Sequence, residues 1–204
     1  MPPVTSNKFL IKKNVMKKTI VIGLLILGFN LHSNAQVKLS LQGGLNFSNL
    51  KASGDDMSLS LGTRTSVNFG LNADFEGSEK FNLRSGLFYN GFGAKGNGEV
   101  LKMDYLTLPV LGRFKIANGF YGFAGPQFGL LLSAKSTYDG DSEDLKADYK
   151  SSNISALFGA EYKFLDKYSL GASYNAGLTN IPKITDGDAK LTTNGFSVNL
   201  GISF

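Results

Sequence analysis

Residues 195–204 read GFSVNLGISF, and this stretch decides the fold. Successive side chains of a β-strand point to opposite faces, so alternate residues share a face. One face carries the apolar side chains of Phe196, Val198, Leu200, Ile202 and Phe204. The other face carries Ser197, Asn199, Gly201 and Ser203. The stretch therefore predicts a strand with one polar face and one face that lies against lipid or against a protein core.

Seven earlier segments repeat this alternation. They cover residues 37–47, 64–76, 81–92, 105–116, 120–135, 154–164 and 168–179. Each is close to the length of about ten residues with which a tilted strand crosses a bilayer. An open sheet edge in lipid would leave backbone groups unpaired, at a cost of several kcal/mol each. The sequence thus predicts an all-β fold, an eight-stranded antiparallel up-and-down transmembrane β-barrel whose last strand pairs with its first.

The connections between the predicted strands alternate in length. Those at residues 77–79, 117–119 and 166–167 are short, whereas those at 49–62, 93–98, 136–150 and 180–194 are longer. Outer-membrane barrels combine tight periplasmic turns with longer external loops. Because the short connections take every even place along the chain, we expect both termini to face the periplasm of a bacterial envelope.

Aromatic residues gather at the short-turn end of the predicted strands, on the apolar face. They are Phe75, Phe81, Phe114, Phe120, Phe164, Tyr168 and Phe204. Membrane barrels carry such girdles where the wall meets the lipid headgroups. The pattern favours a membrane-interface ring; the alternative is that aromatic residues flank the hairpin turns of a water-soluble barrel.

The amino-terminal residues 1–35 have the layout of a leader with a cleavable signal peptide. Met16, Lys17 and Lys18 form a positive start, residues 20–29 form an apolar run, and small residues precede Gln36. The run is too short to span a bilayer as a helix. We expect translation to start at Met16, cleavage to follow Ala35, and residues 36–204 to form the barrel domain.

Charged side chains on the polar faces are expected to point into the lumen. They are Arg64, Asp74, Glu76, Arg84, Arg113, Glu161 and Lys163. Side chains nearly fill the interior of an eight-stranded barrel, so buried charges there must pair. Asp74 and Arg84 lie about equally far from the 77–79 turn, which predicts a cross-strand contact. The expected result is a structural charge network; the alternative is a path for a solute.

Two prolines fall inside predicted strands. Pro109 and Pro126 each lack the backbone N–H that a strand donates to its neighbour. We therefore expect local bulges or bends at both positions.

The residues beyond the leader contain few groups suited to catalysis or metal binding. The single histidine is His32, inside the leader, and the chain has no cysteine. Acids at Asp139, Asp141 and Glu143 resemble the start of a calcium loop, but Asp144 and Lys150 stand where such a loop needs Gly and Glu. We expect a solvated acidic loop, no metal, no cofactor and no enzymatic activity.

The net charge of +5 depends on the leader. The leader holds five lysines and no acid, and its removal leaves 21 − 5 = 16 basic residues against 16 acidic residues. A nucleic-acid partner is therefore not expected, because such proteins carry a basic surface.

Several fragments resemble the PorT-like outer-membrane β-barrel family. They are residues 43–50 (GGLNFSNL), 104–109 (DYLTLP), 125–129 (GPQFG) and 168–181 (YSLGASYNAGLTNI), together with the terminal GISF. The resemblance extends over essentially the whole predicted barrel. It implies a small bacterial outer-membrane barrel in contact with outer-membrane lipid, assembled by periplasmic chaperones and the barrel-insertion machinery. The family has no shared catalytic signature to carry over.

Three functional hypotheses follow from the sequence. The first is an integral outer-membrane barrel with a non-enzymatic structural, adhesive or accessory role, exerted through its external loops. The second is a soluble exported barrel that binds a small apolar ligand in the manner of a lipocalin, which requires the apolar faces to point inward. The third is a narrow solute channel.

Overall fold

Eight long strands account for most of residues 37–204. The structure, a computed structural model, describes residues 37–53, 58–96, 98–165, 167–184 and 190–204, so the predicted leader lies outside it. The long strands are β1 (Val37–Ser53), β3 (Gly62–Glu76), β4 (Phe81–Gly96), β5 (Glu99–Ala117), β6 (Phe120–Tyr138), β8 (Ser152–Phe164), β9 (Tyr168–Gly177) and β10 (Lys190–Ser203). Two short strands, β2 (Ser58–Ser60) and β7 (Asp141–Asp144), are additions to this set. No helix in the described ranges is long and apolar enough to cross a membrane.

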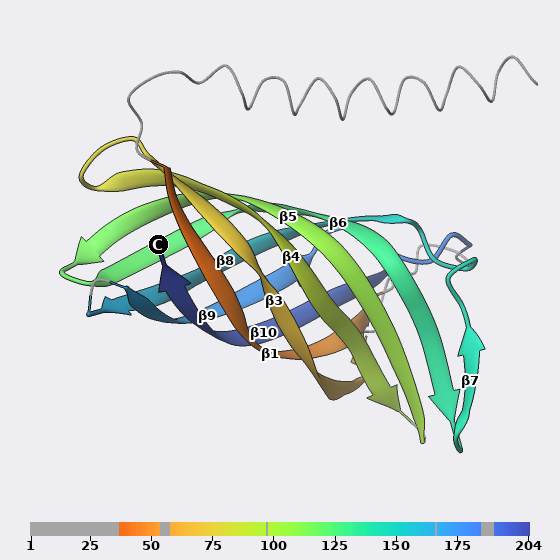
Figure 1. Cartoon of the computed structure of the whole chain (residues 1–204). Helices are drawn as coiled ribbons and strands as arrows, with labels where there is room; N and C mark the ends of the chain where they lie inside the picture. Colours follow the sequence, from red (N-terminus) through yellow and green to blue (C-terminus); the bar gives the residue numbers. More distant parts are fainter. Residues whose placement is uncertain (1–36, 54–57, 97, 166, 185–189) are drawn as a thin grey trace, which may run out of the picture. The chain divides into compact units, whose positions relative to one another are not determined.

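The eight long strands close into a barrel. Each pairs antiparallel with its neighbours in chain order, and β10 returns to pair with β1 along its whole length, from Ser40↔Ser203 to Ser53↔Lys190. Figure 1 shows the strands wound obliquely around one axis, with the blue β10 beside the orange β1. Closure leaves neither β1 nor β10 with an unpaired edge, which is what a bilayer demands. The predicted eight-stranded antiparallel barrel is confirmed.

The apolar faces of the strands point outward. Leu39, Phe69 and Leu200 are 52%, 56% and 63% exposed, although each belongs to a regular strand. The inward faces are polar, and Asn46 and Thr193 are completely buried. A barrel that binds an apolar ligand inside would need the reverse arrangement. The lipocalin-like hypothesis is therefore wrong for this chain.

The strands that end at the long connections are longer than predicted. β5 and β6 have 19 residues each, and only residues 97–98 separate β4 from β5, in place of the expected connection at 93–98. β6 and β7 are joined by Asp139 and Gly140, whose φ angles of 48° and 92° are those of a two-residue hairpin turn. In Figure 1, β7 stands at the opposite end of the barrel from the carboxyl terminus.

A bulge in β6 reverses the alternation of its last residues. Asp104 pairs with Ser133 and Tyr105 with Leu131, so one residue of β6 is extra. Strict alternation from Phe120 onward would point Ser133 and Lys135 inward, but Ala134 is fully buried and Lys135 is exposed. A shift of one residue exchanges the two faces of a strand, and the sequence pattern does not show where the shift occurs.

The bulges expected at the two prolines are absent. Pro109 pairs in register with Gln127, and Pro126 pairs in register with Ala156. The register shifts of the described strands lie elsewhere, between Thr63 and Asn68, between Asp104 and Tyr105, and between Lys115 and Ala117. Each proline interrupts pairing on one side only, Pro109 toward β4 and Pro126 toward β5, and the register is the same before and after the interruption.

Candidate functional site

Four charged side chains form a buried ion cluster at the short-turn end of the lumen. Arg84 on β4 donates from Nε to Asp74 Oδ1 at 2.6 Å and from Nη2 to Asp74 Oδ2 at 2.8 Å. It also donates from Nη1 and Nη2 to the two carboxylate oxygens of Glu161, at 2.6 and 3.1 Å. The predicted contact between Asp74 and Arg84 is present, because the two residues are direct partners across β3 and β4.

Glu161 on β8 holds a second guanidinium. Arg113 on β5 donates from Nε to Glu161 Oε1 at 2.9 Å, and its Nη2 also contacts this oxygen. The guanidinium carbon of Arg113 lies 3.5 Å from the ring centroid of Tyr121. Asp74, Arg84, Arg113 and Glu161 are each at most 8% exposed. Two positive and two negative groups therefore balance inside the barrel, which compensates for the loss of their hydration.

The other three predicted lumen charges lie outside this cluster. Arg64 donates from Nη1 to the carbonyl of Phe92 at 2.6 Å. Glu76 pairs with Lys38 at 2.5 Å, where both side chains are partly exposed. Lys163 is half-buried and makes no ion pair within the described part of the chain. Four of the seven predicted lumen charges therefore form one compact cluster, and the other three lie outside it.

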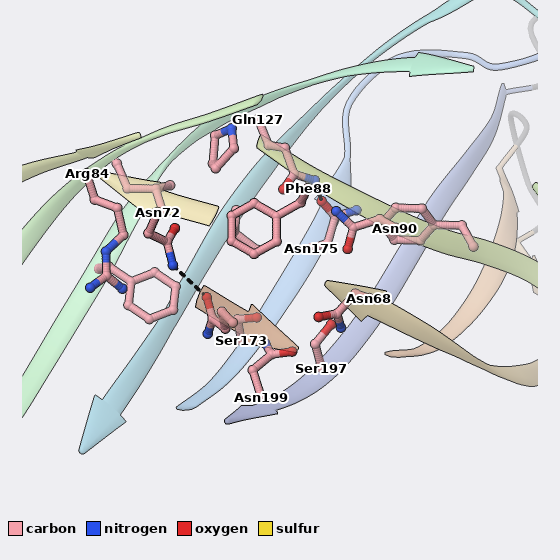
Figure 2. Close-up of a pocket in the computed structure, with 16 residues that line it drawn as sticks. Asn68, Asn72, Arg84, Phe88, Asn90, Gln127, Ser173, Asn175, Ser197 and Asn199 are labelled. Atoms are coloured by element: carbon pink, nitrogen blue, oxygen red, sulfur yellow. Dashed lines mark hydrogen bonds between the residues drawn. The ribbon is translucent and has the colours of Figure 1, made fainter. Parts of the chain in front are cut away.

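A polar chamber follows the ion cluster along the lumen. Figure 2 shows its amide and hydroxyl side chains converging from several strands. Asn72 Nδ2 donates to Gln42 Oε1 at 2.8 Å, and Gln127 Nε2 donates to Asn175 Oδ1 at 3.0 Å. The chamber also includes Phe88, and a cavity of about 50 Å³ remains. The sequence placed these amides on polar faces, but only closure of the barrel brings them together.

An apolar cluster fills the end of the lumen that carries the long connections. Leu50, Phe92, Met103, Tyr105, Leu131 and Ile181 belong to it, with Ala94 and Ala134, and all are at most 3% exposed. Phe92 and Tyr105 meet edge to face with ring centroids 5.9 Å apart. Alternation along the strands does not predict this cluster, because Phe92 lies on a polar face and Ile181 lies in a predicted loop.

The two long connections that follow β6 and β9 are joined to each other. The backbone N–H of Lys150 donates to the carbonyl of Ile181 at 2.8 Å, and that of Lys183 donates to the carbonyl of Asp148 at 2.9 Å. Between these bonds, Tyr149 and Pro182 form an isolated β-bridge. Burial raises the pKa of the Tyr149 hydroxyl, and the nearby Asp148 and Glu99 carboxylates raise it further, so the phenol stays neutral. These connections thus have defined contacts of their own.

The aromatic residues predicted for the membrane interface lie on the outer wall. Phe81 and Phe114 face each other across β4 and β5 with centroids 5.2 Å apart. Phe164 and Tyr168 stack at 5.9 Å across the short turn between β8 and β9. The structure also places Phe75, Phe120 and Phe204 at the short-turn ends of their strands. Tyr162, which the prediction did not include, contacts both Phe120 and Phe164.

The described residues contain no group of three or more His, Cys, Asp or Glu side chains placed to hold a metal ion. The acidic residues between Asp139 and Asp144 instead form the hairpin of β6 and β7. Asp144 accepts a hydrogen bond from the backbone of Lys146 at 2.9 Å.

Several solved structures are similar to this barrel, whereas no curated protein sequence matches the chain. Neisserial surface protein A (NspA) is 15% identical, covers 83% of this chain and 99% of its own, and superposes with a TM-score of 0.55. Ail, the attachment invasion locus protein of Yersinia pestis, is 17% identical, covers 83% of this chain and 99% of its own, and has a TM-score of 0.48. OprG from Pseudomonas aeruginosa is 12% identical, covers 83% of this chain and 97% of its own, and has a TM-score of 0.41. At such identities, the likeness to NspA shows the fold alone.

A match to a sequence family identifies the family, which similarity of fold alone does not. Residues 32–183 match the family described as outer membrane protein beta-barrel domain, and the match covers most of the chain. The apolar outer wall and the closed register of β1 and β10 agree with that description. The chain therefore belongs to the outer membrane protein β-barrel domain family and is an integral protein of the bacterial outer membrane.

Proposed function

We propose that this barrel is a closed, non-enzymatic anchor that presents its joined long connections at the cell surface, in a structural or adhesive role. The observation that carries the proposal is the filling of the lumen at both ends. The ion cluster of Asp74, Arg84, Arg113 and Glu161 fills one end, and the apolar cluster around Phe92 and Ile181 fills the other. A barrel whose lumen is filled in this way holds the long connections in place and offers no continuous path for a solute.

The absence of enzymatic activity is part of the proposal. Residues 36–204 contain neither histidine nor cysteine, the groups that most often act as base or nucleophile near neutral pH. The buried carboxylates of Asp74 and Glu161 each accept hydrogen bonds from arginine at both of their oxygens. Ion pairing of this kind serves structure better than catalysis.

The orientation and the finer family assignment are also proposed. The short turns would face the periplasm together with both termini, and the connection between β6 and β8 would face outward, as is usual for such barrels. The resemblance to the PorT-like family supports a small envelope barrel within the outer membrane protein β-barrel domain family. Periplasmic chaperones and the barrel-insertion machinery would be its partners during assembly, and outer-membrane lipid its surroundings afterwards.

Planar-bilayer recording tests the closed lumen against the narrow-channel hypothesis. Purified, folded protein is expected to give no stable conductance steps, while a known porin reconstituted in the same way gives them. Reproducible steps from this protein would contradict the closed lumen and favour the channel.

Photo-crosslinking on intact cells tests the surface role. A photoreactive side chain at Lys146, in the connection after β7, is expected to capture a surface partner. The same group at Ser78, in a short turn, serves as the control. Equal capture from both positions, or capture from neither, would count against a role for the joined connections.

A further inference from the structure

Two polar atoms in the polar chamber lack a partner. Most amides of the chamber are bonded to one another, but Asn68 Nδ2 and Asn199 Oδ1 are buried and have no hydrogen-bond partner within the described residues. Both residues line the chamber, and both are labelled in Figure 2. Asn68 is 4% exposed, so bulk water does not reach its amide freely. Buried polar groups in native proteins are nearly always satisfied, so this pair requires an explanation.

The two atoms lie on either side of one glycine. Asn68 on β3 is the partner of Gly44 on β1, and Gly44 is in turn the partner of Asn199 on β10. Adjacent strands are about 4.8 Å apart, so the backbones of β3 and β10 are roughly 10 Å apart at this level. The two side chains point into the barrel from either side of Gly44 and line the same cavity.

Gly44 makes room for the side chain of Asn199. A Cβ at this position would lie 2.0 Å from the carbonyl oxygen of Val198 and 2.5 Å from Asn199 Oδ1. These distances are too short for any side chain, so the residue must be glycine for Asn199 to take its observed place. The space open to the two unpaired atoms is therefore the cavity of the chamber, which Asn68 and Asn199 both line.

We propose that ordered water molecules occupy the cavity of the chamber and connect Asn68 Nδ2 to Asn199 Oδ1. Water accepts from one group and donates to the other, which neither a cation nor an anion does. The 50 Å³ of the chamber corresponds to about three or four molecules at ~10–15 Å³ each. The chamber is bounded by Arg84 of the ion cluster and by Phe92 of the apolar cluster, so this water exchanges slowly with the solvent.

The sign of one substitution effect tests the proposal. In a dry chamber, Asn68→Leu would remove an unpaired donor and raise the urea midpoint of unfolding measured in lipid vesicles. In a hydrated chamber, the same change breaks the hydrogen bonds to water and lowers the midpoint. We expect a lower midpoint for Asn68→Leu and for Asn199→Leu.

A double-variant cycle tests whether the two residues share the same water. Asn68→Leu and Asn199→Leu combined are expected to lower the midpoint by less than the sum of the single effects. Asn68→Leu combined with Glu76→Gln, at the partly exposed pair with Lys38, is the control and should be additive. A raised midpoint for Asn68→Leu, or additive effects of the two asparagines, would overturn the bridge.

A direct measurement on the unmodified protein removes any dependence on folding of the variants. Nuclear magnetic resonance in detergent micelles is expected to show magnetisation transfer from long-lived water to the side-chain amide protons of Asn68. The amide of Asn153, which does not line the chamber and donates to Thr193 Oγ1, is the internal comparison. Absence of transfer to Asn68 would overturn the proposal whatever the variants show.

Discussion

At the scale of single residues, Glu161 has the largest predicted effect. It accepts from both Arg84 and Arg113, and Arg113 has no other carboxylate partner in the described structure. Glu161→Gln keeps the shape but leaves buried guanidinium charge uncompensated, so we expect a loss of about 3–5 kcal/mol in the free energy of unfolding. Urea unfolding in lipid vesicles measures it. Glu76→Gln removes a partly exposed pair and should cost less than about 1 kcal/mol; equal losses would contradict the buried cluster.

At the scale of elements, Ile181 holds the connection after β9 against the apolar cluster. It is 1% exposed, and its backbone bonds join Lys150 and Leu191. Ile181→Asp places a charge among apolar side chains, so we expect the joined connections to separate and trypsin to cleave at Lys150 and Lys183 at least tenfold faster, while the barrel stays folded. Ile184→Asp is the matched control, because Ile184 is 87% exposed. Similar cleavage rates for both variants would show that the connections are not held by this contact.

At the scale of the whole molecule, the testable property is orientation in the membrane. The chain has no cysteine, so a single introduced thiol reports its own side of the bilayer. Asp141→Cys, at the exposed end of the β6–β7 turn, should react with a membrane-impermeant maleimide on intact cells. Ser78→Cys, in a short turn, should react only after the outer membrane is opened. The reverse pattern would place the termini outside and contradict the proposed orientation.

The architecture was predictable because it rests on local periodicity. In residues 195–204 every second side chain is apolar, and no distant contact is needed to see that one face requires an apolar environment. The same period in seven more segments, with the cost of an open edge in lipid, leads to a closed barrel. The contact between Asp74 and Arg84 was predictable for a related reason, because a short hairpin turn fixes their register.

The interior was predictable only in part, because its contacts join residues that are distant in sequence. Glu161 lies 77 residues from Arg84, and no local pattern pairs them. The reversed faces of Ser133 and Lys135 depend on where the β6 bulge absorbs one residue, which the neighbouring strand decides. Phe92 and Ile181 do not belong to the alternating apolar face of any predicted strand. They join one apolar cluster only when the long connection after β9 folds over the end of the barrel.

The sequence by itself determined the strands and their polar and apolar faces, since alternation along each strand is a local property. Tertiary structure decided that the apolar faces point outward and which side chains share the lumen, since barrel closure and strand register set those directions and distances. The ion cluster, the polar chamber and the joined connections therefore exist only in the closed barrel.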